Sequence, residues 1–261
     1  MGRTWQRASA GLFDTRILGV FLYPGTEDHV LAGTPSGVYE STDGADSWAL
    51  LAGTESFGGC RSFRNGTVNG VSSILGECGG GIANVPAKGG TWAMIKSPGY
   101  WGSPLSIADN GPTTVVYGCV SGVVVLGTIT TRTATDWSKI PGTKCYVAAI
   151  DPNNKDHFIF SNSTPGDFKV IESTDGGKST HPLVGNVVGG RGLVSPWCFY
   201  VAIDRKGWYY TGAEAGAFRT MDGGKNWAPY EVVMQSRAGI LDFGLTLTDF
   251  LRVLKQSVCD L

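Results

Sequence analysis

Short apolar segments rich in β-branched and aromatic residues alternate along the chain with glycine-rich turns. The first four such segments lie at residues 17–23, 29–33, 37–41 and 48–52. Segments of this length and composition, bounded by turn residues, are typical of β-strands. Glycine occurs 39 times in 261 residues, far above the ordinary share of about 7%, and without a three-residue period. The pattern therefore predicts an all-β chain of many short strands joined by tight turns.

The same order of four strands recurs further along the chain. The later segments are 146–151, 157–161, 168–173 and the residues from 180, followed by 199–204, 208–212, 217–220 and the residues from 227. Residues 151–154, Asp-Pro-Asn-Asn, join the first two of these segments and favour a β-turn. A recurring unit with four strands, here named A to D, predicts a repeat architecture.

A short motif marks the turn between strands C and D of each unit. Residues 37–48, 169–180 and 216–227 all end in Ser/Thr-x-Asp-x-Gly/Ala-x-Ser/Asn-Trp/Thr. Weaker copies at 87–92 and 130–137 keep the tryptophan, the first with Ala87 where the aspartate belongs. The last motif position falls at 5, 48, 92, 137, 180 and 227, so the intervals are 43, 44, 45, 43 and 47 residues. This spacing, with four strands per unit, is typical of β-propeller blades.

The motif resembles the Asp box, or BNR repeat, of sialidases, sortilin-type receptors, xyloglucanases and a photosystem II assembly factor. The resemblance implies an all-β fold, a β-propeller of four-stranded antiparallel blades. About five blades plus partial terminal strands fit in the chain. Because residues 2–5 match the end of a motif, the chain is either a ring closed by its N-terminal strand or a fragment of a six- or seven-bladed ring.

Two regions are expected within the chain. Residues 1–235 form the Asp-box propeller, and residues 236–261 form a C-terminal tail that is a partial blade or a short helix. Within this tail, residues 248–258 have a threonine cap followed by apolar residues at helical spacing.

The aspartates of the motif are interpreted as structural rather than catalytic. A carboxylate at the C–D turn accepts hydrogen bonds from the backbone of that turn, as in Asx turns, and the tryptophan packs between neighbouring sheets. The structural residues expected on this basis are Ser41, Asp43, Trp48, Ser173, Asp175, Thr220, Asp222 and Trp227.

Charge and hydropathy narrow the classes of partner. Lys and Arg number 21 and Asp and Glu 22, a net charge of -1 without a polybasic run, which argues against nucleic-acid binding. No apolar run reaches the roughly 18 residues that a membrane helix needs, so no membrane span is expected. The expected partner is a glycan or a protein.

The resemblance implies that a ligand binds near the propeller axis, on the face formed by the D→A and B→C loops. Two D→A loops carry aromatic residues directly before a strand A, and sugar rings stack on such side chains. The predicted ligand-binding residues are Tyr100, Trp101 and Trp197, with Arg64 and Arg191 at the rim. The alternative is that these rings pack blade against blade.

The predicted function is a non-catalytic binding or assembly module, and the alternative is a glycoside hydrolase, xyloglucanase-like or sialidase-like, or its inactive remnant. Xyloglucanase-like hydrolysis requires two opposed carboxylates across a cleft. The candidates are Asp167 and Glu214, in B→C loops of adjacent units. The Asp-Gly-Gly-Ala-Tyr-Arg element of xyloglucanases is absent, and residues 16–18 echo the Arg-Ile-Pro element of sialidases only in part.

The cysteines and histidines predict neither a disulfide framework nor a metal or cofactor site. Cys78 and Cys119 occupy equivalent ends of strand B, and Cys145 and Cys198 occupy equivalent starts of strand A. Equivalent positions in neighbouring blades are expected to exceed the roughly 7 Å between Cα atoms that a disulfide can bridge. No CxxC pair occurs, and His29, His157 and His181 are scattered along the chain.

Overall fold

The computed structural model describes residues 7–79, 81–97, 105–133, 135–162, 170–183, 186–187, 198–213 and 216–229. Within these ranges the chain folds into five β-sheets, one after another in chain order, with no α-helix. In each sheet the four main strands pair with their sequence neighbours in antiparallel orientation. The prediction of an all-β chain of four-stranded blades is therefore confirmed.

The strands of the five sheets, each given in the order A to D, have the following bounds. The first sheet contains β1 (Gly19–Leu22), β2 (Val30–Thr34), β3 (Gly37–Ser41) and β4 (Ala49–Leu50). The second contains β5 (Cys60–Val68), β6 (Val71–Cys78), β7 (Gly81–Pro86) and β8 (Ala93–Lys96), after the short 3-10 helix η1 (Glu55–Phe57). The third contains β9 (Ser106–Asn110), β10 (Thr113–Val120), β11 (Val123–Ile129) and β12 (Thr135–Lys139). The fourth contains β13 (Cys145–Asp151), β14 (Asn154–Asn162), β15 (Val170–Ser173) and β16 (His181–Pro182). The fifth contains β18 (Cys198–Ile203), β19 (Tyr209–Ala213), β20 (Gly216–Thr220) and β21 (Asn226–Pro229).

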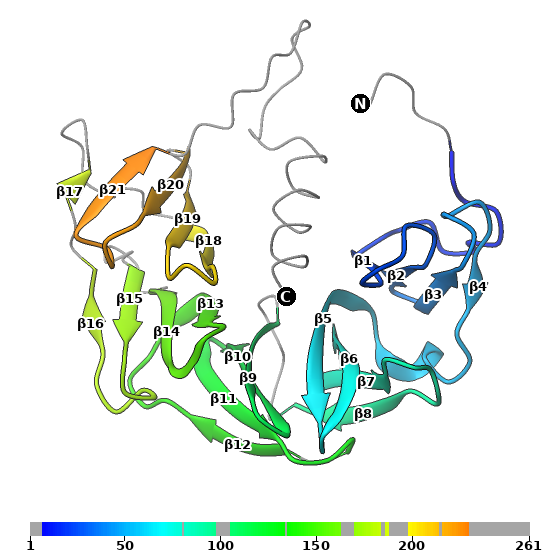
Figure 1. Cartoon of the computed structure of the whole chain (residues 1–261), viewed down its shortest axis with the longest axis horizontal. Helices are drawn as coiled ribbons and strands as arrows, with labels where there is room; N and C mark the ends of the chain where they lie inside the picture. Colours follow the sequence, from blue (N-terminus) through cyan, green and yellow to red (C-terminus); the bar gives the residue numbers. More distant parts are fainter. Residues whose placement is uncertain are drawn as a thin grey trace, which may run out of the picture.

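The sheets are arranged around a common centre, so each one is a propeller blade. Figure 1 shows the five blades along an arc, with β1–β4 at one end and β18–β21 at the other and the first strand of each blade on the inner side. Consecutive blades contact each other mainly through these strands: β1 with β5, β5 with β9, β9 with β13, and β13 with β18. The second strand of the third blade, β10, also contacts β13. The end of each blade at which strand A begins is called the loop face, and the end at which strand C turns into strand D is called the box face.

The fifth blade carries one strand that the sequence pattern did not predict. β17 (Asn186–Val187) pairs in parallel with β21, with Asn186 opposite Asn226 and Val187 opposite Trp227. It comes from the segment between the fourth and fifth blades, and it covers the outer edge of the fifth blade. Residues 1–6 and 230–261, which include the predicted C-terminal tail, lie outside the described part of the chain.

The hydrophobic core consists of layers between blades rather than one central mass. Leu31 of the first blade packs with Phe63 of the second, and Tyr117 of the third packs with Phe158 of the fourth. Trp227 of the fifth blade is fully buried in the layer shared with the fourth. Each blade therefore depends on its neighbours to bury its apolar surface, as in other repeat proteins.

Three C–D turns at the box face have the same hydrogen bonds. In the first, Ser41 Oγ donates to Asp43 Oδ1 at 2.8 Å and accepts from the backbone N–H of Ala45 at 2.9 Å. Asp43 Oδ1 also accepts from the backbone N–H of Ser47 at 2.9 Å. Residues 173–179 and 220–226 repeat this pattern with 2.7–3.0 Å distances. The three segments 41–48, 173–180 and 220–227 are called the box turns.

Two tryptophans of the motif, Trp48 and Trp137, contact the preceding unit through their indole N–H groups. Trp137 Nε1 donates to the carbonyl of Lys96 in β8 at 3.0 Å. Trp48 Nε1 donates in the same way to the carbonyl of Ala8 at 3.1 Å, and the Trp48 backbone N–H donates to Ala10 at 2.8 Å. The N-terminal residues thus lie beside the first blade much as β8 lies beside the third.

The prediction that the cysteines form no disulfides is wrong. Cys60 is bonded to Cys78 within the second blade, and Cys119 is bonded to Cys145 between the third and fourth blades. The prediction compared equivalent positions in different blades, but each bonded pair joins the start of a strand A to the end of a strand B. Both positions lie at the loop face, where the Cα atoms of the two pairs are 4.0 and 5.8 Å apart, within the reach of a disulfide.

Candidate functional site

Most of the residues predicted to bind a ligand or to catalyse hydrolysis lie outside the described part of the chain. This applies to Tyr100, Trp101, Asp167, Arg191, Trp197 and Glu214. Arg64 is described: it lies on β5, is half-buried, and its Nη1 donates to the Phe63 carbonyl at 2.8 Å. The ligand site that Arg64 is expected to share with Tyr100, Trp101 and Trp197 therefore remains a prediction.

Strand A carries a β-bulge at the loop face in three blades. The register shifts between Cys60 and Ser62, between Cys145 and Ala148, and between Cys198 and Tyr200. A bulge of this kind redirects the side chain of the extra residue. The residue after the cysteine is Arg61 in the second blade, with a side chain 46% exposed, and Tyr146 in the fourth, which is 54% exposed. Sequence reasoning missed these positions, although the shared cysteine before each bulge was a usable signal.

A buried carboxyl group lies behind Arg61. Glu77 on β6 is only 2% exposed, and its Oε1 is 3.9 Å from Arg61 Nη1. Ser62 Oγ donates to Glu77 Oε2 at 3.4 Å. Burial raises the pKa of Glu77 to about 7, although the Arg61 charge and the Ser62 hydroxyl act in the opposite direction. Near neutral pH this carboxyl group is thus close to the midpoint of its titration.

In contrast to Glu77, the carboxylates of the box turns have lowered pKa values. Asp43 and Asp222 are solvent-exposed and Asp175 is half-buried, and hydrogen bonds from the turn lower the pKa of all three to about 2. The largest contribution comes from the Ser47 and Ser179 hydroxyls in the first two turns and from the Asn226 backbone N–H in the third. Carboxylates that remain ionised at neutral pH cannot act there as general acids.

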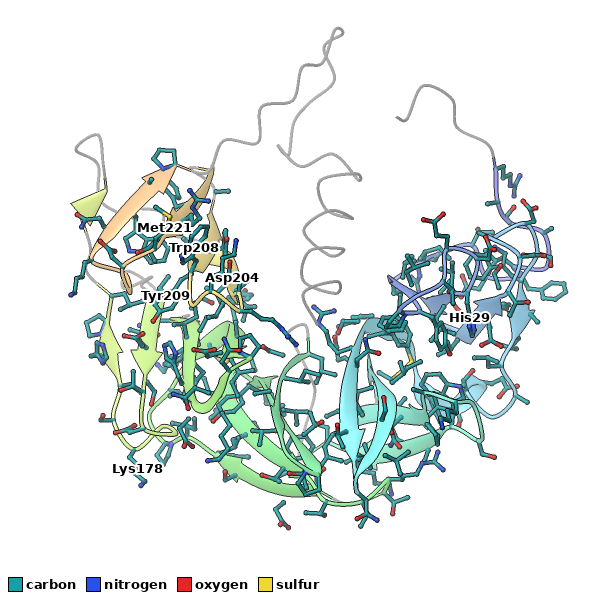
Figure 2. All side chains as sticks on the ribbon, in the orientation of Figure 1. His29, Lys178, Asp204, Trp208, Tyr209 and Met221 are labelled. Carbon is teal, nitrogen blue, oxygen red and sulfur yellow. A yellow bond between two sulfur atoms is a disulfide. The ribbon has the colours of Figure 1, made fainter. Side chains whose placement is uncertain are left out.

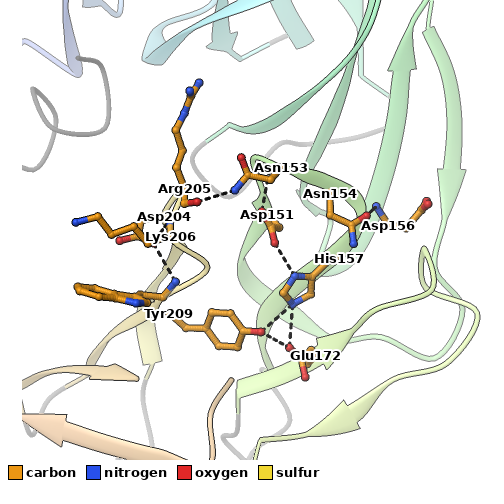
Figure 3. A network of polar contacts seen from close by, with 11 residues as sticks. Asp151, Asn153, Asn154, Asp156, His157, Glu172, Asp204, Arg205, Lys206 and Tyr209 are labelled. Carbon is orange, nitrogen blue, oxygen red and sulfur yellow. Dashed lines mark hydrogen bonds and ion pairs between the residues drawn. The ribbon is translucent and has the colours of Figure 1, made fainter. Parts of the chain in front are cut away.

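A network of polar side chains joins the fourth and fifth blades (Figure 3). His157 Nδ1 is 2.9 Å from Asp151 Oδ2, and His157 Nε2 is 2.9 Å from Glu172 Oε1. Tyr209 of the fifth blade donates its hydroxyl to Glu172 Oε1 at 2.6 Å. On the other side of the carboxylate, His181 Nε2 is 2.9 Å from Glu172 Oε2. Two of the three histidines, interpreted from sequence as scattered, therefore meet at one carboxylate.

The network favours charged forms of His157 and Glu172. Burial acts against the charge of His157, but hydrogen bonds to Glu172 and Asp151 and the two negative charges outweigh it and raise the pKa of the imidazole. Burial likewise acts against the charge of Glu172, but hydrogen bonds from His157 and Tyr209 and the charges of both histidines lower its pKa. The arrangement is that of a buried ion pair between strands.

The repeat positions of His157 and Glu172 also carry an interacting pair of side chains in two other blades. In the first blade His29 Nε2 is 2.7 Å from Glu40 Oε1, and in the fifth the guanidinium of Arg219 lies 4.9 Å from the Trp208 ring centre. His29 and Trp208 lie at opposite ends of the arc (Figure 2). In each pair one residue directly precedes the strand-B residue that lies opposite the first residue of a box turn, and the other directly precedes that box turn. The shared Glu-Ser-x-Asp sequences at 40–43 and 172–175 could have revealed the pairs of the first and fourth blades.

No group of three or more His, Cys, Asp or Glu side chains in the described ranges is arranged to hold a metal ion. No helix among those residues is long and apolar enough to cross a membrane.

No protein-family model matches the chain, and no curated protein sequence matches it. Solved structures do resemble it. The β-propeller domain of Cps50 (Swd1) from Myceliophteria thermophila has a TM-score of 0.54 and 11% sequence identity, over 78% of this chain and 64% of that one. The fold is a β-propeller. At these identities the likeness shows the fold alone.

Two further solved structures match most of this chain, but the matched region is a minor part of each of those proteins. The GH74 enzyme of Niastella koreensis has a TM-score of 0.58 and 18% identity, over 80% of this chain and 37% of the enzyme. PorZ of Porphyromonas gingivalis, a bacterial surface component of the type-IX secretion system, has a TM-score of 0.56 and 15% identity, over 83% of this chain and 34% of PorZ. This chain thus spans well under half the length of either protein.

Proposed function

We propose that the three box turns are Asp boxes and that the chain is an Asp-box propeller. The identical hydrogen bonds around Asp43, Asp175 and Asp222 support this, because they give each aspartate the same task of holding a turn. Ser41, Ser173 and Thr220 complete the turns. On this proposal residues 1–235 belong to the propeller, and residues 236–261 form a partial blade or a short helix.

The function we propose is binding of a glycan at the loop face without hydrolysis. The observation that carries it is the exposure of Tyr146, 54% of its surface, at a bulge directly after the bonded Cys145. An exposed tyrosine ring on a rigid strand is a platform for a sugar, because the ring stacks on the apolar face of the sugar and the hydroxyl bonds at its edge. Rigid scaffolds that present such groups lose little conformational freedom on binding.

Further residues extend this surface. Arg61 takes the bulge position of the second blade, and Arg64 lies on the same strand β5. Tyr100, Trp101, Trp197 and Arg191 belong to the D→A loops of the same face by their place in the repeat, and we include them in the proposed ligand-binding surface.

A glycoside hydrolase is the second candidate function. Two observations favour it: the likeness in fold to a GH74 enzyme, and the raised pKa of Glu77, which is typical of a general acid. Against it, Glu77 is buried behind Arg61, and hydrolysis needs a second carboxyl group roughly 5–9.5 Å from the first, across the scissile bond. Asp167 and Glu214 remain the candidates for carboxylates on the B→C loops.

A protein partner on the same face is the third outcome to be tested. Arginine and aromatic residues dominate the energetics of protein interfaces, so Arg61 and Tyr146 suit a protein as well as a sugar. A glycan ligand is distinguished by competition with free oligosaccharide, which does not displace a protein bound over a large area.

The experiment combines binding and product analysis on the whole chain. A panel of neutral and acidic oligosaccharides is titrated by calorimetry, and each mixture is then analysed by chromatography for cleavage products. We expect saturable binding of at least one oligosaccharide and no products. Release of products that stops in Glu77→Gln, Asp167→Asn or Glu214→Gln would replace the binding proposal with the hydrolase. Absence of binding to every oligosaccharide would refute the glycan-binding function.

A further inference from the structure

A cavity of about 340 Å³ opens at the box face between the second and third blades. It lies between the β5–β6 turn, the end of β7 and the β11–β12 turn, at the opposite end of the blades from the loop face. Val71 and Pro86 form an apolar part of its wall, and Asn69, Thr131 and Thr133 supply amide and hydroxyl groups. Its volume is near the lower end of the range of about 300–1,000 Å³ found for small-molecule sites.

Arg132 lines this cavity and is held by a buried partner. Its Nε donates to Asn84 Oδ1 at 3.2 Å, and its Nη2 donates to the carbonyls of Asn84 and Thr91. Asn84 is fully buried, and its Nδ2 donates back to the Arg132 carbonyl at 2.8 Å. These reciprocal bonds cross from the second blade to the third and fix the position of the guanidinium group.

The charge of Arg132 has no counter-ion among the described residues. All three of its acceptors are neutral oxygens, and no described carboxylate forms an ion pair with it. Its Nη1 makes no hydrogen bond within the described ranges, which leaves two of the five guanidinium donors for another group. An oxyanion is the acceptor that these N–H groups bind most strongly, because hydrogen bonds between charged partners are about twice as strong as those between neutral groups.

Arg132 occupies a repeat position that is an aspartate in the box turns. Counted back from the motif tryptophan, Trp137, it stands where the box turns have Asp43 and Asp222, so a cation replaces the anion that holds those turns. The neighbouring second blade has Ala87 at the same position. The turn-holding carboxylate is therefore absent from both blades that border the cavity.

We propose that this cavity is a second ligand site, which takes a molecule of monosaccharide size that bears one oxyanion, a sugar carboxylate or a sugar phosphate. Arg132 binds the oxyanion, Asn69, Thr131 and Thr133 hydrogen-bond to sugar hydroxyls, and Val71 and Pro86 contact the apolar face of the ring. The site is independent of the proposed function, because it lies on the other face of the propeller and shares no residue with the loop-face surface.

The test is a titration of the whole chain in which binding is monitored by the amide chemical shifts in NMR spectra. The probes are methyl glucuronide, glucose 6-phosphate and neutral methyl glucoside. We expect at least one acidic probe to give saturable shifts confined to residues near 69–73 and 131–133, with the neutral sugar at least about tenfold weaker. The stronger acidic probe identifies the oxyanion. Lack of saturable shifts at these residues for both acidic probes would overturn the proposal.

Three variants separate binding from folding. Arg132→Gln is expected to weaken the acidic probe by about tenfold or more. Val71→Trp fills the cavity but keeps Arg132 and its bonds, and it is expected to abolish binding. Lys139→Gln removes an exposed positive charge from β12 of the third blade and is expected to leave affinity unchanged within about twofold. If Arg132→Gln does not fold, Val71→Trp decides; a folded Val71→Trp that binds as tightly as the unmodified chain contradicts the site.

Discussion

Glu172 accepts a hydrogen bond from Tyr209 at 2.6 Å, and this contact joins the fourth blade to the fifth through a carboxylate that is also 2.9 Å from His157. The sequence separation of the two residues is 37. The carboxylate is 9% exposed in its side chain, so its interactions are weakly screened by solvent. We therefore expect packing between these two blades to depend on the protonation state of His157.

We predict that this network makes stability depend on pH. A raised folded-state pKa of His157 means that its contribution is complete below the unfolded value of about 6.5 and is lost as the pH rises through the folded value. The lowered pKa of Glu172 means that its contribution is present above about 4.3 and is lost as the pH falls through the folded value. Urea unfolding of His157→Gln at pH 6 should show a loss of roughly 3 kcal/mol, and the loss should shrink at alkaline pH.

The matched control for this prediction is His29→Gln. The His29–Glu40 pair occupies the same repeat position, but its side chains are 30% and 28% exposed. Its loss should cost less than about 1 kcal/mol. Equal effects of the two substitutions, or parallel pH profiles for His157→Gln and the unmodified chain, would show that the network has no special role.

The box turns predict a separate loss of stability in acid. Because the pKa values of Asp43, Asp175 and Asp222 are lowered to about 2, their contribution is complete above the unfolded value of about 3.9 and disappears as the pH falls through about 2. Asp43→Asn should lower the melting temperature by a few degrees at neutral pH, and the difference should vanish near pH 2. Asp46→Asn, in the same turn, is the control and should have no effect at either pH.

Backbone conformation in the box turns gives a pair of opposite predictions. Ala45 has a φ of 75°, in a position where the other two turns have Gly177 and Gly224 with φ of 88° and 81°. Ala45→Gly should stabilise the chain by about 1 kcal/mol, because glycine adopts this conformation without strain. Gly177→Ala should destabilise it by about 2 kcal/mol or more, since its Cβ would lie 2.5 Å from Ile140 Cδ1. Chemical unfolding measures both, and a stabilising Gly177→Ala would contradict the assignment of these turns.

The two disulfides predict the reactivity of the cysteines. Alkylation of the unfolded, unreduced chain should spare Cys60, Cys78, Cys119 and Cys145. Removal of either disulfide should cost about 3 kcal/mol, from the closed loops of 18 and 26 residues. Mass spectrometry that finds all six cysteines alkylated without reductant would refute both bonds.

The blades could be predicted from sequence because their signal is local. The strand segments, the glycine turns and the motif around Asp43 and Asp222 are each recognised from a few consecutive residues. The spacing of the tryptophans also locates the second and third blades, which carry only weak copies of the motif. β17 escaped prediction because a two-residue parallel strand has no pattern of its own.

The contacts between blades could not be predicted in this way. The bond between Cys119 and Cys145 and the Glu172–Tyr209 hydrogen bond join strands of different units, so they depend on how one blade packs on the next. The burial of Glu77 depends on the same packing. Comparing equivalent positions in the repeat misses such pairs, because neighbouring blades meet through positions that are not equivalent.

The measurement that tests the central claim most directly is the affinity of Tyr146→Ala for the oligosaccharide that binds the unmodified chain best. Loss of one stacked ring should weaken calorimetric binding by roughly tenfold, with the melting temperature unchanged. Phe13→Ala removes an aromatic side chain that is 93% exposed in the N-terminal segment and should leave the affinity unchanged. Unaltered affinity in Tyr146→Ala, or an equal loss in Phe13→Ala, would contradict glycan binding at the loop face.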